Sequence, residues 1–253
     1  MRMRYPSRMN RGFAAGFFLA LSLPVFPSVA LAIDVIDSPD ITKGEMDATY
    51  FGSRTFDRNH DKNDLQDSEA TLEYSPTGYW HTEIGGFFSK TPDQSFQMDG
   101  VEWNNFFQFS EKGARWLDSG IEIALQQSTH DDLASSIGTK LLLEKDVGKF
   151  VNIANIGLTQ EVGAHASGGP DRAFQWNTQY TLCDEFAPGF EVQSDFGKPN
   201  EGLGFNQGQH YIGPGIYGTF MDHFHYEAAY LAGVSSGASD SAVRFLFQYQ
   251  TTY

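Results

Sequence analysis

The chain has 253 residues, 15% of them aromatic, and a formal net charge of −15 at pH 7. Aromatic residues spread along the whole length exclude intrinsic disorder, which requires low hydrophobicity. The excess of acidic residues disfavours nucleic acid and anionic lipid surfaces as partners, and it favours cations or a solvated acidic interior.

The first segment has the pattern of a secretory signal peptide. Four arginines precede an apolar run at residues 13–29, and Ala30 and Ala32 supply the small residues of a cleavage site. An anchoring helix is the alternative, which Pro24 and Pro27 within a run of about 17 residues disfavour. We therefore expect a signal peptide at residues 1–32. The mature chain, residues 33–253, would carry 13 basic against 32 acidic residues, a net charge of −19.

Cys183 is the only cysteine, so the chain has no intramolecular disulfide even though the compartment would permit one. A zinc site built on cysteines is excluded for the same reason, and we interpret Cys183 as an incidental turn residue. The glycine-rich stretches at residues 167–170 and 202–204 lack a strand-to-helix context, so neither is predicted to cradle a phosphate. We expect no cofactor.

The mature chain repeats a segment of about ten residues with alternating hydrophobicity, followed by turn residues. This pattern is typical of a transmembrane β-barrel, whose strands turn apolar residues to lipid and polar residues to the interior. Neither a helical period nor a domain boundary interrupts it after residue 43. We therefore predict an all-β fold, a single antiparallel barrel preceded by a short periplasmic leader at residues 34–42. The twelve expected strands lie at about residues 43–55, 68–74, 79–89, 100–110, 117–126, 135–144, 150–161, 172–182, 190–196, 209–219, 223–230 and 241–253.

One of these segments, residues 150–161, is irregular. Val151 and Ile153 lie on one phase of the alternation, whereas Ala154, Ile156 and Leu158 lie on the other. Either a β-bulge or a strand with an apolar patch on its buried face would produce this pattern.

The polar face of the segments is strongly acidic. We expect an acidic lumen that attracts cations and disfavours anions. Only Lys140 and Arg244 clearly oppose these carboxylates on the same face. The alternative is that the carboxylates only solvate the interior and pair with other basic residues, whose positions the pattern does not give. The residues expected to set selectivity are Glu45, Asp47, Glu69, Glu73, Glu83, Glu102, Glu191, Asp195, Glu227 and Arg244; Glu122, Glu144 and Glu161 share the same face.

A metal site is a further hypothesis. His223 and His225 share one face of a predicted strand, Glu227 follows on that face, and His81 can add a ligand from another strand. Imidazole and carboxylate together suit zinc, copper or nickel. The alternative is a polar lumen lining without a metal.

Enzymatic activity has one candidate residue. Lipid-A deacylases and outer-membrane phospholipases are barrels with Ser–His chemistry on the outer wall, where the serine and histidine must lie within hydrogen-bond reach. His210 is the outward-facing histidine, but no His-Ser motif of those families is present. We expect no catalytic residues and no enzymatic activity.

The last segment, residues 241–253, has an aromatic face, a largely polar face and an aromatic final residue. Alone, it also fits a strand of a soluble sandwich. Together with the other segments it resembles the closing strand of a bacterial outer-membrane barrel, whose end the barrel assembly machinery recognises. The residues expected to form this assembly signal are Phe245, Phe247, Tyr249 and Tyr253.

Two adjacent stretches resemble a particular family. Residues 186–192 read Phe-Ala-Pro-Gly-Phe-Glu-Val, and residues 209–216 read Gln-His-Tyr-Ile-Gly-Pro-Gly-Ile. A strand that opens with Pro-Gly and a Glu, followed by a strand with Gly-Pro-Gly, resembles the late strands of the outer-membrane transporters associated with phenol meta-pathway degradation. The resemblance covers about thirty residues. It implies a single barrel of transporter type and no catalytic residues.

Taken together, the sequence predicts a monomeric, porin-like barrel in the outer membrane of a Gram-negative bacterium. We expect passive passage of small solutes through an acidic, cation-favouring lumen. The expected partners are outer-membrane lipid, the barrel assembly machinery and small solutes or cations. The alternative is a nontransporting structural or metal-binding outer-membrane protein.

Overall fold

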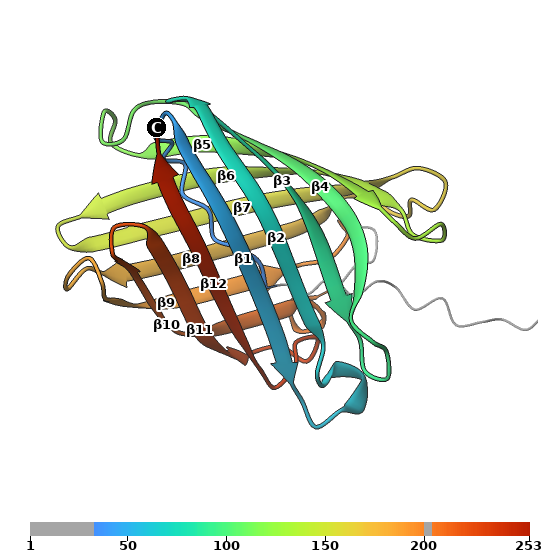
Figure 1. Cartoon of the computed structure of the whole chain (residues 1–253). Helices are drawn as coiled ribbons and strands as arrows, with labels where there is room; N and C mark the ends of the chain where they lie inside the picture. The colour runs from blue at the N-terminus through green and yellow to red at the C-terminus, as the bar shows by residue number, and fades with distance from the viewer. Residues whose placement is uncertain (1–32, 200–203) are drawn as a thin grey trace, which may run out of the picture.

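The computed structural model describes residues 33–199 and 204–253, and in this part of the chain twelve antiparallel strands form one closed barrel (Figure 1). Each strand pairs with the next, and the last pairs with the first, so the predicted all-β barrel is confirmed. The predicted signal peptide at residues 1–32 lies outside the described residues. The strands are β1 (Glu45–Phe56), β2 (Gln66–Thr77), β3 (Trp80–Lys90), β4 (Gln97–Gln108), β5 (Asp118–Ser128), β6 (Ser135–Val147), β7 (Phe150–Val162), β8 (Asp171–Tyr180), β9 (Ala187–Asp195), β10 (Gln209–Phe220), β11 (Phe224–Gly233) and β12 (Ser241–Thr252), with short 3-10 turns η1 (His60–Lys62) and η3 (Phe205–Gln207).

The barrel closes where β12 lies beside β1 (Figure 1). Their register is continuous from the pair Glu45 and Thr252 to the pair Phe56 and Ser241. Beyond it, the Tyr253 amide donates to the Gly44 carbonyl at 3.0 Å. Closure leaves no strand edge with free N–H and C=O groups. The four aromatic residues of the expected assembly signal lie on the outward face or at the end of β12, and their recognition by assembly machinery stays a prediction.

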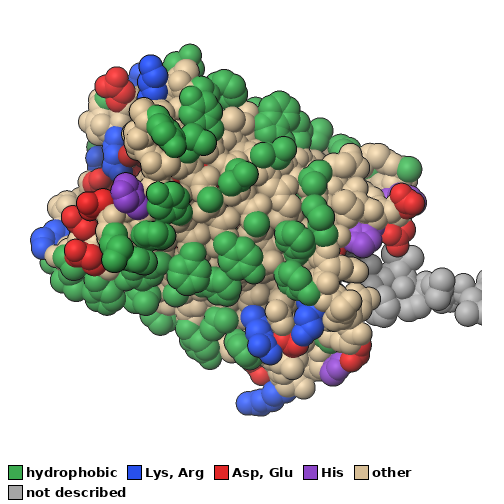
Figure 2. All heavy atoms as spheres, in the orientation of Figure 1, with side chains coloured by type: hydrophobic (Ala, Val, Ile, Leu, Met, Phe, Trp, Pro, Cys, Tyr) green, Lys and Arg blue, Asp and Glu red, His purple; other side chains and the backbone are tan. Residues whose placement is uncertain are grey.

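Side chains alternate between the two faces of the wall as the sequence predicts. On β1, Met46 and Tyr50 are exposed on the outside, whereas Asp47 and Ser53 are buried inside. Figure 2 shows the result on one face of the molecule, where hydrophobic side chains cover the middle and charged side chains gather toward the margins. An apolar exterior around a polar interior is the reverse of a soluble protein and is typical of membrane barrels.

The irregular segment at residues 150–161 forms β7 without a bulge. Its register with β6 runs unbroken from the pair Ser135 and Val162 to the pair Val147 and Phe150. Ile153 therefore shares the inner face with Asn155, and both are buried, while Ile156 is exposed on the outside. The bulge interpretation is wrong, and an apolar patch faces the lumen at this point.

The stretch before β1 contradicts the expectation of a periplasmic leader. Residues 33–42, here called the inner segment, run inside the barrel (Figure 1). At one end Ile33 packs into a buried cluster with Tyr211, Leu231 and Ala238, of which Ala238 belongs to the β11–β12 loop. At the other end the chain enters β1 beside Tyr253. The inner segment therefore crosses the lumen from the rim of the long loops to the rim that carries the C-terminus.

Among the described residues, no helix is long and apolar enough to cross a membrane.

Tyr50→Lys is expected to lower the free energy of unfolding by about 2–4 kcal/mol, because a charge in the middle of the lipid-facing band loses its hydration. Thr49→Lys, one residue away on the inward face, is the matched control and is expected to be tolerated. Heat-modifiable gel migration across a urea series measures both. Equal destabilisation by the two variants would contradict the assignment of inner and outer faces.

Candidate functional site

The lumen contains the residues that the sequence predicts to set selectivity. Their side chains occupy the inward face of β1–β4, β9, β11 and β12. Asp195 stands apart from the rest, because it lies at the end of β9 and accepts a hydrogen bond from the Gly197 amide at 2.7 Å. The structure thus places the predicted residues on the inner wall. Their effect on ion selectivity stays a prediction.

Arg244 is the centre of a buried ion-pair cluster. Its Nε lies 2.7 Å from Glu191 Oε2, and its Nη2 contacts Glu191 Oε1 and lies 2.8 Å from Glu227 Oε2. The Tyr217 hydroxyl donates to Glu191 Oε1 at 2.5 Å, and His225 Nε2 lies 3.2 Å from Glu227. Arg244 is only 1% exposed, so it neutralises two carboxylates instead of standing as a free cation in the lumen.

Two glycines make room for the tyrosine of this cluster. A Cβ at Gly189 would lie 2.8 Å from the Tyr217 ring, and a Cβ at Gly215 would lie 2.6 Å from its hydroxyl oxygen. Gly189 and Gly215 face each other across β9 and β10. The Pro-Gly and Gly-Pro-Gly stretches therefore lie side by side in the sheet, and their local role is to admit Tyr217 to the lumen.

Side-chain amides hold the backbone of the inner segment. Asn155 accepts from the Asp37 amide at 2.8 Å and donates to the Asp37 carbonyl at 2.9 Å. Gln193 donates to the Asp34 carbonyl at 3.0 Å and accepts from its amide at 3.5 Å. Buried backbone groups need such partners when no strand pairs with them. Asn155 and Gln193 thus provide hydrogen-bond partners for the backbone of the inner segment, as a neighbouring strand would.

Lys140 is the second buried cation of the lumen. Its Nζ lies 2.7 Å from Asp37, 3.2 Å from Asp34 and 3.1 Å from Glu122. The Ser38 hydroxyl donates to Glu144 at 2.5 Å. The hydrogen bonds of residues 34–38 with the strands go to β6–β9, so the inner segment follows that wall in its middle part.

The loop between β4 and β5 contacts the inner segment at the rim of the barrel. Lys112 lies 2.7 Å from Glu144 and 3.4 Å from Asp40. Partial burial opposes the charge of Lys112, but the hydrogen bond to Glu144 and the nearby carboxylates outweigh burial and raise its pKa to about 12. The ammonium is therefore charged at physiological pH, and it ties the segment to the barrel wall.

The opposite wall carries carboxylates without basic partners. We call this set the acidic wall; it lies on β1–β4. Within the described part of the chain, no Lys or Arg forms an ion pair with any of its members, and His81 is the ion-pair partner of two of them. Its members are Glu45, Asp47, Glu69, Glu73, Glu83 and Glu102. Arg244 and Lys140 lie elsewhere, and the inner segment reaches this wall through one polar contact, from the Ile41 amide to Gln108 on β4. The lumen is therefore divided electrostatically into a neutralised side and an anionic side.

The predicted metal ligands are only partly brought together. His223 lies exposed in the turn before β11, and its Nδ1 lies 3.0 Å from the Gln250 carbonyl oxygen. His225 is half-buried in the lumen beside Glu227, which Arg244 already engages. Metal binding by the two histidines stays a prediction, and His81 belongs to a different group of ligand atoms.

The outward histidine is covered and does not face lipid. His210 is 2% exposed, and its ring stacks on Phe205 with a centroid distance of 4.0 Å and lies against Phe196 at 5.0 Å. Among the described residues, no serine hydroxyl hydrogen-bonds its ring. His210 therefore lies on the outward phase of β10, as the sequence predicts, but Phe205 of η3 covers its ring.

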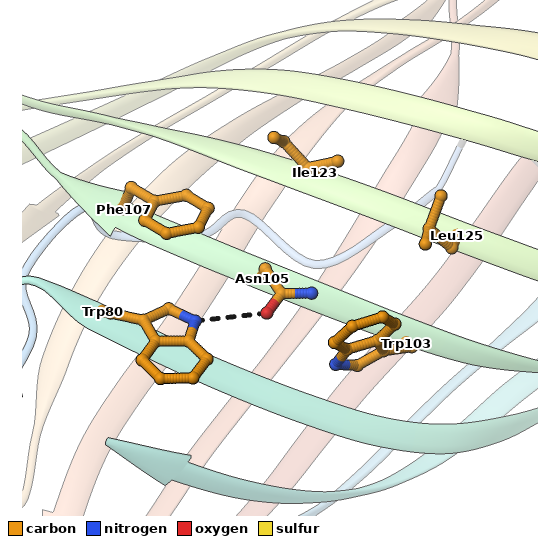
Figure 3. A pocket seen from close by; sticks show the side chains of 6 residues that line it. All are labelled: Trp80, Trp103, Asn105, Phe107, Ile123 and Leu125. Carbon is orange, nitrogen blue, oxygen red and sulfur yellow. Dashed lines mark hydrogen bonds between the residues drawn. The ribbon is translucent and has the colours of Figure 1, made fainter. Parts of the chain in front are cut away.

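A shallow depression marks the lipid-facing side of β3–β5 (Figure 3). Trp80 donates its indole N–H to Asn105 Oδ1 at 3.1 Å, and Trp103 donates to Thr82 Oγ1 at 2.9 Å. The indole rings thereby provide partners for polar atoms on an otherwise apolar wall. Trp, Phe, Ile and Leu side chains line this part of the barrel, so acyl chains fit its chemistry.

Comparison with solved structures identifies the architecture. The chain is similar to the KdgM porin in complex with disordered oligogalacturonate, with a TM-score of 0.54 and 8% identity over 83% of this chain and 99% of that one. The fold is that of an outer-membrane barrel. A chain from work on the in-meso crystallization of membrane proteins matches with a TM-score of 0.48 and 9% identity over 82% of this chain and 84% of that one. A bacterial polysaccharide outer membrane secretin matches with a TM-score of 0.44 and 10% identity over 87% and 100%.

No protein-family model and no curated protein matches the chain. The resemblance to the phenol meta-pathway transporters therefore stays a prediction that depends on the two paired stretches of β9 and β10.

Arg244→Met is expected to lower the free energy of unfolding by about 3–5 kcal/mol, because it leaves two buried carboxylates without a countercharge. Adding Glu191→Gln and Glu227→Gln to the same chain is expected to restore most of that loss. Urea titration of the refolded barrel measures all three proteins. A single variant as stable as the wild type would show that Arg244 does not neutralise the cluster.

Proposed function

We propose that the chain is a monomeric outer-membrane protein that lets small solutes cross passively and favours cations. The observation that carries the proposal is the divided lumen, in which six carboxylates of the acidic wall face the interior without Lys or Arg partners. A pore lined by carboxylates attracts cations and repels anions. The path lies between this wall and the inner segment, which follows β6–β9.

The other parts of the proposal have separate support. An apolar outer face with tryptophans and a closed sheet supports a place in the outer membrane, with its lipid as the surrounding partner. A monomer is proposed because the sheet closes within one chain. A cleaved signal after Ala32 would make the inner segment the start of the mature protein. Membership in the phenol meta-pathway family and recognition of Tyr253 by assembly machinery belong to the proposal as well.

A nontransporting protein is the second candidate, and one observation favours it. The inner segment and the Arg244 cluster occupy the lumen of a barrel with only twelve strands, whereas wide aqueous channels belong to barrels of 16 strands or more. Planar-bilayer recording of the refolded protein decides between the two functions. Discrete cation-preferring conductance supports the channel, and a silent membrane at all potentials supports the second candidate.

Neutralising part of the acidic wall is expected to reduce cation preference. In Glu45→Gln/Glu69→Gln/Glu102→Gln, the reversal potential in a potassium chloride gradient should move toward zero, because three negative charges leave the path. The control neutralises three carboxylates of the long loops, Asp61→Asn/Asp93→Asn/Asp131→Asn. Equal shifts in the two triple variants would argue against selectivity by the acidic wall.

Removing the inner segment is expected to widen the path. Deleting residues 34–40 should raise the single-channel conductance, because the segment crosses the lumen. Asn155→Ala/Gln193→Ala keeps the segment but removes its backbone tethers, and it should produce currents that fluctuate between two levels. A deletion variant with wild-type conductance would place the path elsewhere.

A further inference from the structure

A group of metal-ligand atoms lies on β2 and β3, away from the histidines that the sequence indicates. Glu73, His81 and Glu83 each direct one ligand atom inward, and these atoms lie within 4.8 Å of one another. His81 Nε2 lies 3.6 Å from Glu73 Oε2 and 4.0 Å from Glu83 Oε2. The side chains of Glu73, His81 and Glu83 are 7%, 14% and 12% exposed, so they form an inner cluster and not a surface patch.

The spacing is close to that of a zinc site. Zinc bonds of about 2.0–2.1 Å at tetrahedral angles place neighbouring ligand atoms about 3.3 Å apart. The two distances from His81 Nε2 exceed this value by tenths of an ångström, which side-chain rotation can supply. Three protein ligands leave a fourth position for water, as in open zinc sites.

Hydrogen bonds already orient all three ligands. Ser75 Oγ lies 2.9 Å from His81 Nδ1 and can accept a hydrogen bond from Nδ1–H, which leaves Nε2 free to bind a metal. The Thr71 hydroxyl donates to Glu73 Oε1 at 2.7 Å, and Asn104 donates to Glu83 Oε1 at 2.7 Å. In each carboxylate Oε1 accepts the short bond and Oε2 is turned toward His81, although Gln248 also donates to Glu73 Oε2 at 3.4 Å.

A fourth group, Asp47, supplies an independent sign that this row of carboxylates can hold a cation. Asp47 lies directly opposite Glu73 across β1 and β2, and Glu73 lies directly opposite Glu83 across β2 and β3. Like charges at directly opposite positions destabilise a sheet. Asp47 is only 5% exposed, and its Oδ1 has no hydrogen-bond partner among the described residues. A bound divalent cation would neutralise two carboxylates of this row.

We propose that Glu73, His81 and Glu83 bind a divalent transition-metal ion such as Zn²⁺ inside the lumen, with Asp47 beside the site. An imidazole ligand favours zinc-type ions, whereas Ca²⁺ takes six to eight oxygen ligands and Mg²⁺ prefers water and carboxylates. The site goes beyond the proposed channel function and does not depend on it, because binding requires no path through the barrel.

Calorimetric titration of the refolded barrel with Zn²⁺, and separately with Mg²⁺, tests the proposal. We expect one Zn²⁺ per chain and weaker binding of Mg²⁺. His81→Gln and Glu83→Gln should each weaken Zn²⁺ binding by more than about tenfold, since even loss of an outer partner of a metal ligand costs that much. Heat-modifiable migration verifies that each variant is folded, and the second variant serves if the first does not fold.

The control is His225→Gln, which removes another inward histidine beside a carboxylate. It should bind Zn²⁺ as the wild type does. The proposal is overturned if the wild type shows no saturable Zn²⁺ binding, if His81→Gln and Glu83→Gln bind as the wild type does, or if His223→Ala/His225→Ala abolishes binding instead. Zinc binding by a barrel that conducts no current would reject the channel and keep the metal site.

Discussion

The constraint on which the structure depends is the pairing of β12 with β1. Inside a lipid bilayer no water is available to unpaired backbone groups, so a sheet that crosses it must close on itself. Once the sheet closes, one face of every strand contacts lipid and the other face contacts a narrow interior. The polar side chains must therefore be accommodated in the interior, where charge is hard to solvate. The pairing of Arg244 and Lys140 with carboxylates follows from that need.

The interior solves this problem in two different ways. Along β5–β12, two buried cations and the amide side chains of Asn155 and Gln193 satisfy carboxylates and the inner segment's backbone. Along β1–β4, the carboxylates face one another, and among the described residues their ion-pair partner is His81, while Thr71 and Asn104 donate hydrogen bonds to them. A lumen built of uniform polar residues would show no such division. This asymmetry separates the anionic side of the lumen from the side that the inner segment fills. Both the proposed cation path and the proposed metal site lie on the anionic side.

Much of the fold was predictable because alternation is a local signal. The twelve strands, the closing pair and the inward phase of residues such as Glu73 and Glu191 follow from period two along each segment. The path of residues 33–42 was not predictable, because the strand residues that hydrogen-bond it lie 67 to 159 residues away in the sequence and the segment has no period. The covering of His210 was not predictable for a similar reason, since Phe205 reaches it from a loop. To predict that Glu73 and Glu83 face each other, one needs the register between β2 and β3, which the alternation along each strand does not give.

The inner segment also constrains the order in which the molecule assembles. Ile33 contacts β10, β11 and the loop before β12, while the other end of the segment leads into β1, so the wall encloses residues 33–42 on all sides. A closed ring of hydrogen-bonded strands cannot easily be threaded afterwards by a polar chain. The inner segment is therefore expected to be in position before β1 pairs with β12, so that the sheet closes around it. The inner segment would then be among the first parts of the barrel to take up its position, and the β1–β12 pair the last.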